Sequence, residues 1–415
     1  MEKIIFDCDN TMGIEGRPMD DGLALLYLLG RSDQARVLGI TCNYGNGTAE
    51  EVYGCCRRLL DEARLSNIPL YRGAERGEDP RSDSARFIAE TAAAFPGEVS
   101  VLGLGSLTNL YGAWLLDPKV FDELKGIVLM GGVTQRLNVH GKPLDELNFS
   151  VNAQASACVL GKGKRISVIT GNNCLPVSYL PKDEFMPKMC WTDNPAGMYI
   201  AQKCGYRFED KKAIYGADGS YCWDAVAAVY LLHPELFTHH PTPCRISEED
   251  LSWGYLAPAE DGEQVLDLPQ ARERVEFQNE LYQGWLALDL EGAGSGFACK
   301  GSFFDKFLQP AILVELSREP GHGFALLQRL KEDDLMGGEG LDPTGMYRTL
   351  KRMEKAGYLT SSWDKSGPKA RRVFQITELG RYSLNNWENS LRRYSDHIDR
   401  LMEAIQAEKR EMNRY

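Results

Sequence analysis

Short apolar runs alternate with longer amphipathic stretches from the start of the chain to about residue 290. Short apolar runs bounded by turn residues indicate buried strands, and their alternation with helical periodicity is typical of a sheet covered by helices. The pattern therefore predicts an α/β fold: a mostly parallel open sheet with helices on both faces. The predicted strands are residues 3–6, 37–41, 68–71, 99–104, 126–130 and 165–170.

The pattern changes after residue 290. Residues 291–302 are rich in Gly and Ser and lack periodicity, which predicts a linker between a first domain at 1–290 and a second at 303–415. In the second domain, three helical patterns and a turn precede two strands and a long helix. This order predicts a winged-helix domain. The segments are 304–316, the turn 320–323, 324–331, 343–356, the strands 358–363 and 372–377, and the helix 378–409.

Charge separates the same two regions. The chain of 415 residues carries a net charge of −12, but the segment from residue 302 onward has 19 Lys+Arg against 17 Asp+Glu. That segment therefore carries +2 and the preceding residues −14, which indicates two different tasks.

No apolar run approaches the roughly 20 residues that cross a bilayer, so we expect no membrane partner. Met1 leads directly into the first predicted strand and the 11 cysteines show no C-x-x-C spacing, so we expect reduced thiols and a cytoplasmic location.

Four carboxylates lie where the first predicted strand passes into a helix at residues 22–29. They are Asp7, Asp9, Asp20 and Asp21. Such a cluster repels itself unless a cation binds or some members stay protonated. Ligands that are all oxygen favour calcium or magnesium over zinc. The sequence therefore predicts a divalent cation at this junction.

This stretch resembles the opening D-x-D-x-x-x-D-D motif of the inosine-uridine nucleoside hydrolase family, with a longer loop, residues 10–19, between the two acidic pairs. Four more segments are similar to family motifs, and the resemblance covers roughly residues 1–290. They are GLGSLTN at 103–109, IVLMGG at 127–132, ELN at 146–148 and WDAVA at 223–227.

The resemblance implies hydrolysis of the N-glycosidic bond of ribonucleosides with Ca²⁺ as the cofactor. It assigns the metal to the carboxylates of Asp9, Asp21 and Asp224 and the backbone carbonyl of Leu104. Asp9 is also the expected catalytic base, and Asp7 is expected to orient the site from behind. The remaining substrate contacts that it implies are Asp20, Asn46, Glu146, Asn148 and Trp223.

Trp223 departs from the commoner family pattern. Branches that prefer inosine and uridine carry a His before the last Asp, whereas a purine-preferring branch has a Trp that stacks on the base. Trp223 thus indicates a preference for purine nucleosides, with a core aromatic as the alternative interpretation. His140, which precedes the ELN segment, is a further candidate ligand contact.

The second domain is similar to the PadR transcriptional-regulator family, through the segments 321–330, 343–359 and 366–380. Residues 343–372 carry eight Lys+Arg against two acidic residues, which favours double-stranded DNA as a partner. A solvated basic face is the alternative. The candidate DNA contacts are Thr344, Tyr347, Arg348, Lys351, Arg352, Lys365, Lys369, Arg371 and Arg372.

Apolar residues at spacings of three and four in the final helix predict a dimer interface. They are Leu384, Trp387, Leu391, Tyr394, Ile398 and Leu401. We expect a homo-oligomer, although either domain could supply the interface.

Two functions stay open from the sequence. One is a ribonucleoside hydrolase with a DNA-binding domain, and the other is a nucleoside-sensing regulator whose hydrolase domain mainly binds. The presence of all the carboxylates favours turnover.

Overall fold

The computed structural model describes residues 1–190, 194–216, 218–290, 305–333, 343–365, 370–384, 387–388 and 391–392. Contacts divide the chain into two units, which we call the first and the second unit. The first comprises Met1–Met186 and Lys203–Ala293, and the second Pro187–Gln202 and Gly294–Tyr415. The predicted linker at 291–302 lies outside the described residues, so the domain boundaries stay a prediction.

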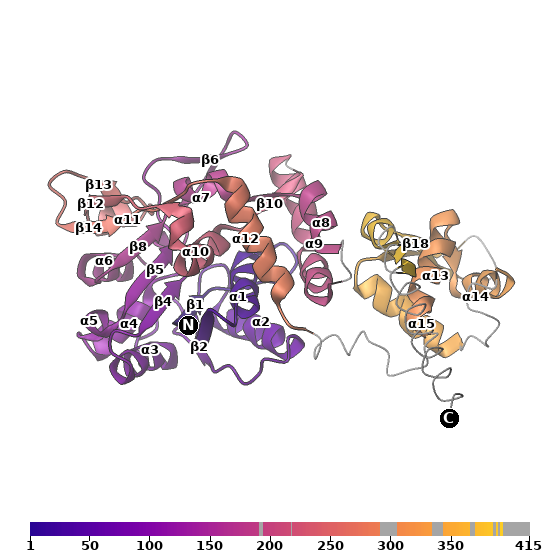
Figure 1. Ribbon diagram of the computed structural model, residues 1–415, viewed down its shortest axis with the longest axis horizontal. Coiled ribbons are helices and arrows are strands. Elements are labelled where there is room, and N and C mark those ends of the chain that lie inside the picture. The colour runs from indigo at the N-terminus through magenta and orange to yellow at the C-terminus, as the bar shows by residue number, and fades with distance from the viewer. Residues whose placement is uncertain are drawn as a thin grey trace, which may run out of the picture. The chain divides into compact units, whose positions relative to one another are not determined.

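A sheet of nine strands, counted over the described residues, forms the centre of the first unit (Figure 1). Its order is β13-β12-β14-β8-β5-β4-β1-β2-β3, and neighbours from β14 to β3 run parallel. The predicted strands agree with the observed ones to within two residues at each end, which confirms the mostly parallel α/β fold. These are β1 Glu2–Cys8, β2 Ala35–Cys42, β3 Leu70–Arg72, β4 Val99–Gly103, β5 Gly126–Met130 and β8 Ile166–Ile169.

The helices that cover this sheet form two groups, and the members of each group pack against one another. One group contains α1 Asp20–Gly30, α7 Gly171–Ser178, α10 Trp223–Leu232 and α12 Arg274–Ala287. The other contains α3 Asp83–Ala94, α4 Thr108–Leu116, α6 Ala153–Lys162 and α11 Glu248–Leu251. The other α-helices that the structure describes before residue 290 are α2 Ala49–Glu62, α5 Val120–Glu123, α8 Lys182–Cys190 and α9 Pro195–Tyr215.

Helix α1 lies at the centre of the first group and is buried along almost its whole length. It begins at Asp20, two residues before the predicted start, because both acidic residues belong to its first turn, where negative charge interacts favourably with the helix dipole. The indole of Trp285 in α12 donates to the carbonyl of Leu23 over 2.9 Å. The burial of α1 therefore fixes the position of the two carboxylates at its N-terminus.

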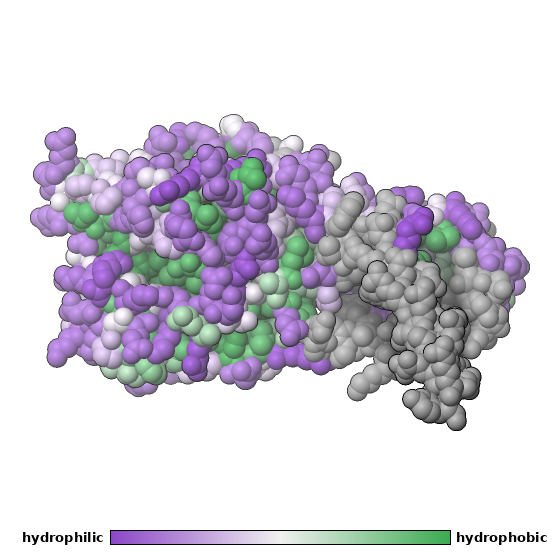
Figure 2. Space-filling view, in the orientation of Figure 1, coloured by the Kyte–Doolittle hydropathy of each residue, from purple (hydrophilic) through white to green (hydrophobic). Residues whose placement is uncertain are grey.

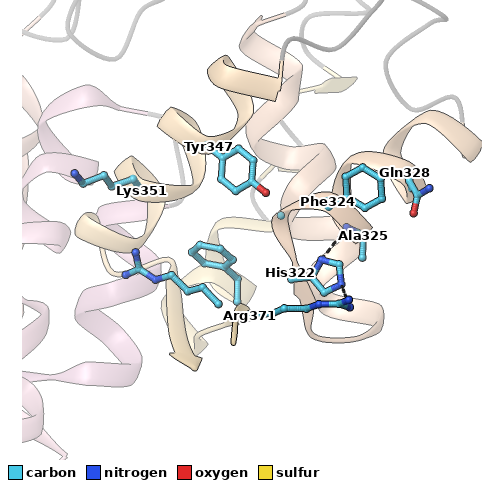
Figure 3. A pocket seen from close by; sticks show the side chains of 10 residues that line it. His322, Phe324, Ala325, Gln328, Tyr347, Lys351 and Arg371 are labelled. Atoms are coloured by element: carbon cyan, nitrogen blue, oxygen red, sulfur yellow. Dashed lines mark hydrogen bonds between the residues drawn. The ribbon is translucent and has the colours of Figure 1, made fainter. Parts of the chain in front are cut away.

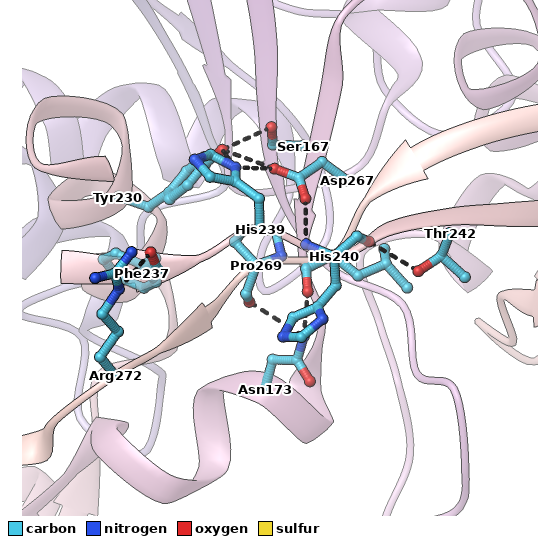
Figure 4. A network of polar contacts seen from close by, with 11 residues as sticks. Ser167, Asn173, Tyr230, Phe237, His239, His240, Thr242, Asp267, Pro269 and Arg272 are labelled. Carbon is cyan, nitrogen blue, oxygen red and sulfur yellow. Dashed lines mark hydrogen bonds and ion pairs between the residues drawn. The ribbon is translucent and has the colours of Figure 1, made fainter. Parts of the chain in front are cut away.

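The sheet is extended by antiparallel strands that the sequence pattern did not predict. These are β12 Pro241–Arg245, which is antiparallel to both of its neighbours, β13 Ala257–Pro258 and β14 Gln264–Asp267; β14 itself runs parallel to β8. A polar network ties this extension to the end of α10 (Figure 4). The Asp267 carboxylate contacts the His239 ring at 2.6 Å and the Tyr230 hydroxyl at 3.0 Å, and that hydroxyl also contacts Ser167 of β8 at 3.0 Å. Short pairs of strands complete the unit: β6 Leu137–Val139 with β7 Lys142–Leu144, β9 Tyr179–Pro181 with β10 Gly219–Tyr221, and β11 Phe237–Thr238 with β15 Gln270–Ala271.

Within residues 305–376, as far as they are described, the second unit contains three helices around an apolar core, as predicted, and a small antiparallel sheet. The sheet has a third strand, β16, where we predicted only a turn, because Gly321 pairs with Phe374. A two-residue strand is too short to show alternation, so the pattern could not reveal it. The elements are α13 Asp305–Arg318, β16 Gly321–His322, α14 Gly323–Glu332, α15 Pro343–Lys355, β17 Leu359–Asp364 and β18 Arg371–Ile376.

The predicted C-terminal helix begins at residue 378, but most of it lies outside the described residues, as do Tyr394, Ile398 and Leu401. On the face drawn in Figure 2 the surface of the first unit is mainly hydrophilic. Within the described part of the chain, no helix combines the length and the apolarity needed to cross a membrane.

Candidate active site and nucleic-acid interface

Three carboxylates converge where helices α1 and α10 begin. Oxygen atoms of Asp20, Asp21 and Asp224 all lie within 4.8 Å of one another. The three residues are buried, with 8%, 0% and 3% of their surface exposed. Asp224, which the resemblance assigned to the metal, is the second residue of α10. Residues about 200 positions apart in the chain thus form one acidic cluster.

The electrostatics of this cluster favour a bound cation. Burial, and then the charges of Asp224 and Asp9, raise the pKa of Asp21 well above its usual value. Burial and the charges of Asp20 and Asp9 do the same for the pKa of Asp224. The Oδ2 atom of Asp21 is buried and, among the described residues, has no hydrogen-bond partner. A hard divalent ion would neutralise the charge and supply that partner, so the donor set fits Ca²⁺ or Mg²⁺.

Asp9 lies beside the cluster but is not one of its three carboxylates. Its backbone N–H donates to Asp21 Oδ1 over 3.1 Å. Its own carboxylate is fully buried and accepts the backbone N–H of Asn46 at 2.6 Å and the Asn46 side-chain amide at 2.9 Å. Burial raises the pKa of Asp9 to about 7; the Asn46 hydrogen bonds lower it in part, and the charge of Asp20 raises it. A carboxyl that titrates near neutral pH is suited to general-base chemistry.

Asp7, in β1, joins three elements. Its carboxylate accepts hydrogen bonds from Thr41 at 2.5 Å and Asn43 at 2.6 Å, at the end of β2, and from Asn109 of α4 at 2.8 Å. Burial raises the pKa of Asp7 to about 6, and the three hydrogen bonds oppose this rise. These contacts fit the orienting role expected of Asp7, although the role itself stays a prediction.

Asn148 fixes the carbonyl of Leu104. The side-chain amide of Asn148 donates to Leu104 O and to Met130 O, each over 2.9 Å. Both acceptors are carbonyls, so the amide nitrogen faces them and Oδ1 is the atom that can meet a sugar hydroxyl. Sequence reasoning named Leu104 and Asn148 separately and missed the bond between them. No local signal could have revealed a contact 44 residues apart.

Glu146 uses most of its hydrogen-bonding capacity within the protein. Oε1 accepts from the backbone N–H of Gly132 at 3.0 Å and of Phe149 at 2.8 Å, and Oε2 accepts from that of Ser150 at 2.9 Å. A carboxylate has about four acceptor positions, so little remains for a substrate. Burial raises the pKa of Glu146, and the hydrogen bonds counteract it. The contacts show that Glu146 anchors the segment that carries Asn148.

The long loop between the two acidic pairs is held at several points. The Tyr206 hydroxyl accepts from the backbone of Gly13 at 3.4 Å and donates to Arg17 O at 3.2 Å. Arg207 donates to Gly16 O over 3.3 Å. The Arg17 guanidinium donates to the carbonyl of Asn46, whose amide groups contact Asp9. The loop at residues 10–19, which is longer than in the family motif, is therefore held in place by hydrogen bonds to α9.

In the second unit, side chains from the four elements β16, α14, α15 and β18 line a pocket of about 730 Å³ (Figure 3). Of the predicted DNA contacts, Tyr347 and Lys351 of α15 and Arg371 and Arg372 of β18 lie there. Arg372 also pairs with Glu354 over 2.7 Å, so part of its charge is compensated. Lys365 is exposed and Arg352 is half-buried, and neither lines the pocket. The side chains of Thr344 and Arg348, and the whole of Lys369, lie outside the described residues.

The other lining residues were not predicted as contacts, and His322 and Phe324 are the most informative of them. His322 caps α14, because its Nδ1 accepts the backbone N–H of Ala325 over 3.2 Å. Phe324 is 59% exposed beside Tyr347, which is 51% exposed. Aromatic residues exposed next to cationic ones are the signal that could have identified this face.

Comparison with known proteins decides the family. Residues 4–280 match the profile described as inosine-uridine preferring nucleoside hydrolase. The chain belongs to this family. Residues 312–386 match the transcriptional regulator PadR-like family, so a nucleoside hydrolase is fused to a PadR-like domain.

Individual hydrolases support this assignment at low identity. Probable uridine nucleosidase 1 of Oryza sativa subsp. japonica is 24% identical over 282 residues, 61% of this chain and 84% of that protein. The pyrimidine-specific ribonucleoside hydrolase RihB of Escherichia coli (strain SE11) is 24% identical over 260 residues, 56% of this chain and 79% of that protein.

Solved structures confirm the nucleoside hydrolase fold. A plant nucleoside hydrolase, the PpNRh1 enzyme, and the purine-preferring ribonucleoside hydrolase from Gardnerella vaginalis each superpose with a TM-score of 0.60 at 21% identity. Each alignment covers 69% of this chain and 99% of the other.

Proposed function

We propose that the first unit is a calcium-dependent ribonucleoside hydrolase that prefers purine nucleosides. The observation that carries the proposal is the buried cluster of Asp20, Asp21 and Asp224, with an unpartnered oxygen on Asp21. Beside it lies Asp9, a carboxyl with a pKa near 7. Together they offer a cation site and a neighbouring base, since the backbone of Asp9 is hydrogen-bonded to Asp21.

The roles of the residues follow from their surroundings. Asp21, Asp224 and the Leu104 carbonyl would hold the ion, and Asp9 or Asp20 would complete the protein ligands. When bound, Ca²⁺ supplies charge that acidifies a water molecule and attracts the two vicinal hydroxyls of ribose. Asp9 accepts the proton of the attacking water, and the acidic cluster favours the positively charged, oxocarbenium-like sugar. Asn148 Oδ1 accepts from a ribose hydroxyl.

Trp223 supports the purine preference. Its side chain is half-buried rather than enclosed in a core, and it directly precedes Asp224 at the start of α10. A purine offers a larger flat surface for stacking on an indole than a pyrimidine does. The names of the curated relatives point to uridine and pyrimidine substrates, and one structural neighbour is named as purine-preferring. The measured preference between purine and pyrimidine nucleosides therefore decides between these two possibilities.

Release of free base from inosine and uridine tests this proposal. We expect cleavage with CaCl₂, loss of cleavage after EDTA treatment, and recovery when Ca²⁺ is restored. Higher kcat/KM for inosine than for uridine would support the purine preference, and the reverse order would refute it. A protein that cleaves neither nucleoside with Ca²⁺ present would refute the hydrolase assignment.

We further propose that the second unit binds double-stranded DNA through the face that carries Tyr347, Lys351 and Arg371. Positive charge on a recognition helix and a wing supplies affinity for phosphates. Dimerisation through the final helix would present two such faces, and access to DNA places the protein in the cytoplasm. If a nucleoside changes DNA affinity and is never cleaved, the sensing function replaces the enzymatic one.

A further inference from the structure

Four aromatic rings meet next to the acidic cluster of the first unit. Tyr221 and Trp223 stack in parallel, with ring centroids 4.9 Å apart and an angle of 13°. Tyr179 packs against Tyr221 at 5.1 Å. His140 meets Tyr179 and Tyr221 edge-on, at 5.7 Å and 6.2 Å. Only Trp223 and His140 belong to the candidates that the sequence suggested, and the two tyrosines link them.

The stack determines which face of the indole can meet a ligand. Tyr221 is buried and covers one face of Trp223, so only the opposite face is available to a flat molecule. Parallel stacking also restricts rotation of the indole about its side-chain bonds. Because Asp224 follows Trp223 at the start of α10, the indole is held beside the proposed sugar site.

Tyr221 is itself fixed by hydrogen bonding and by strand pairing. Its hydroxyl lies 3.0 Å from Nε2 of His140. Strand β10 pairs with β9 so that Tyr221 is opposite Tyr179. Gly219 makes room for the Tyr179 ring, since a Cβ there would lie 2.4 Å from a ring carbon. The position of the buried Tyr221 ring is thus determined by strand pairing, by its hydrogen bond and by the neighbouring rings.

His140 connects this aromatic group to the segment that holds the sugar-binding candidate. It lies in the turn between β6 and β7, with a φ of 48°, and the chain continues from there to Glu146 and Asn148. Glu146 anchors that segment through three backbone hydrogen bonds. The contact of His140 with Tyr221 therefore joins the base side of the site to its ribose side.

We propose that Tyr221 and His140 are positioning residues that hold the Trp223 indole as the platform on which the nucleobase stacks. The proposal rests on the proposed nucleoside hydrolase function and deepens it. A direct proton transfer from Tyr221 to the base does not fit the geometry. A base stacked on the free face of Trp223 at a similar separation would lie about 10 Å from the Tyr221 ring, beyond hydrogen-bond reach.

Binding of the free base separates this platform from the sugar and metal site. Calorimetry with a free purine base and, separately, with ribose is carried out on the full chain in CaCl₂. For Tyr221→Leu we expect the Kd of the purine and the KM of the purine nucleoside to rise roughly three- to tenfold. The Kd of ribose should stay unchanged, and kcat should change less than KM.

Two milder variants keep the test valid if Tyr221→Leu fails to fold. Tyr221→Phe keeps the stacked ring and removes only the hydroxyl. His140→Asn removes the imidazole but tolerates the left-handed backbone, so its effect reports the lost contact rather than strain. Both should raise the Kd of the purine by about two- to threefold and leave that of ribose unchanged.

An unchanged purine Kd in all three variants would overturn the proposal, and so would an equal rise in the Kd of ribose. The outcome is separate from the proposed function. If the wild-type protein cleaves no nucleoside while Tyr221→Leu still weakens purine binding, the platform stands and the hydrolase assignment falls.

Discussion

Replacing Asp9 by Asn should change the stability of the metal-free protein in a direction that depends on pH. Burial raises the pKa of Asp9 from 3.8 to about 7. Below pH 3.8 the carboxyl is protonated in both the folded and the unfolded chain, so ionisation costs nothing. Between 3.8 and about 7 only the unfolded chain loses the proton, and the free energy of unfolding falls as pH rises. Above about 7 the full penalty applies.

The magnitude follows from the size of the shift. About three pKa units correspond to ~4 kcal/mol of lost stability at pH 8. Asn avoids this penalty but turns an amide N–H toward a donor of Asn46, which costs ~1–3 kcal/mol. The variant should therefore be more stable than the wild type at pH 8 by ~1–3 kcal/mol. At pH 4 the variant should be less stable than the wild type by a similar amount. The wild-type carboxyl is then protonated in the folded chain, so Asn no longer avoids an ionisation penalty and only the cost of the lost hydrogen bond remains.

Urea unfolding in EDTA at pH 4 and pH 8 measures this crossover. Asp33→Asn, at an exposed position, serves as a surface control and should show no change of sign. With CaCl₂ the order at pH 8 should reverse, because the ion stabilises the ionised wild-type carboxyl. Turnover of inosine should fall at least 100-fold. Destabilisation of the metal-free variant at both pH values would refute the reasoning.

Three other predictions concern separate parts of the chain. Gly45→Ala should reduce turnover at least 100-fold, because its Cβ would lie 2.1 Å from Asp9 Oδ2, whereas Gly54→Ala in α2 meets only a flexible side chain at 3.6 Å and should keep full activity. Thr48→Ala should lower the free energy of unfolding by ~1 kcal/mol without loss of turnover, since it removes the capping box of α2, and a change below the error of urea titration would contradict this. Lys351→Ala should reduce the slope of log K for DNA against log salt by about 0.9, and an unchanged slope would exclude a phosphate contact.

The sequence was informative wherever the signal is local. The run at 126–130 and the observed strand β5 coincide, and Thr48 with Glu51 three residues later forms a capping box, a pattern that is legible in the sequence. Strand and helix periods and capping chemistry depend on neighbours a few residues away, so one chain suffices to read them. Strand β16 was not predicted, because two residues are too few to show an alternating pattern.

The carboxylates, the α/β pattern and the winged-helix order were thus determined by the sequence itself. The tertiary structure alone decided which distant groups meet: Asp224 with Asp20, Asn148 with the Leu104 carbonyl, and Tyr221 with His140. In a parallel sheet the order of strands is set by how helices cross over it, and that order places loops far apart in the chain at one edge. Such contacts arise from packing of the whole chain, so no stretch of residues encodes them separately.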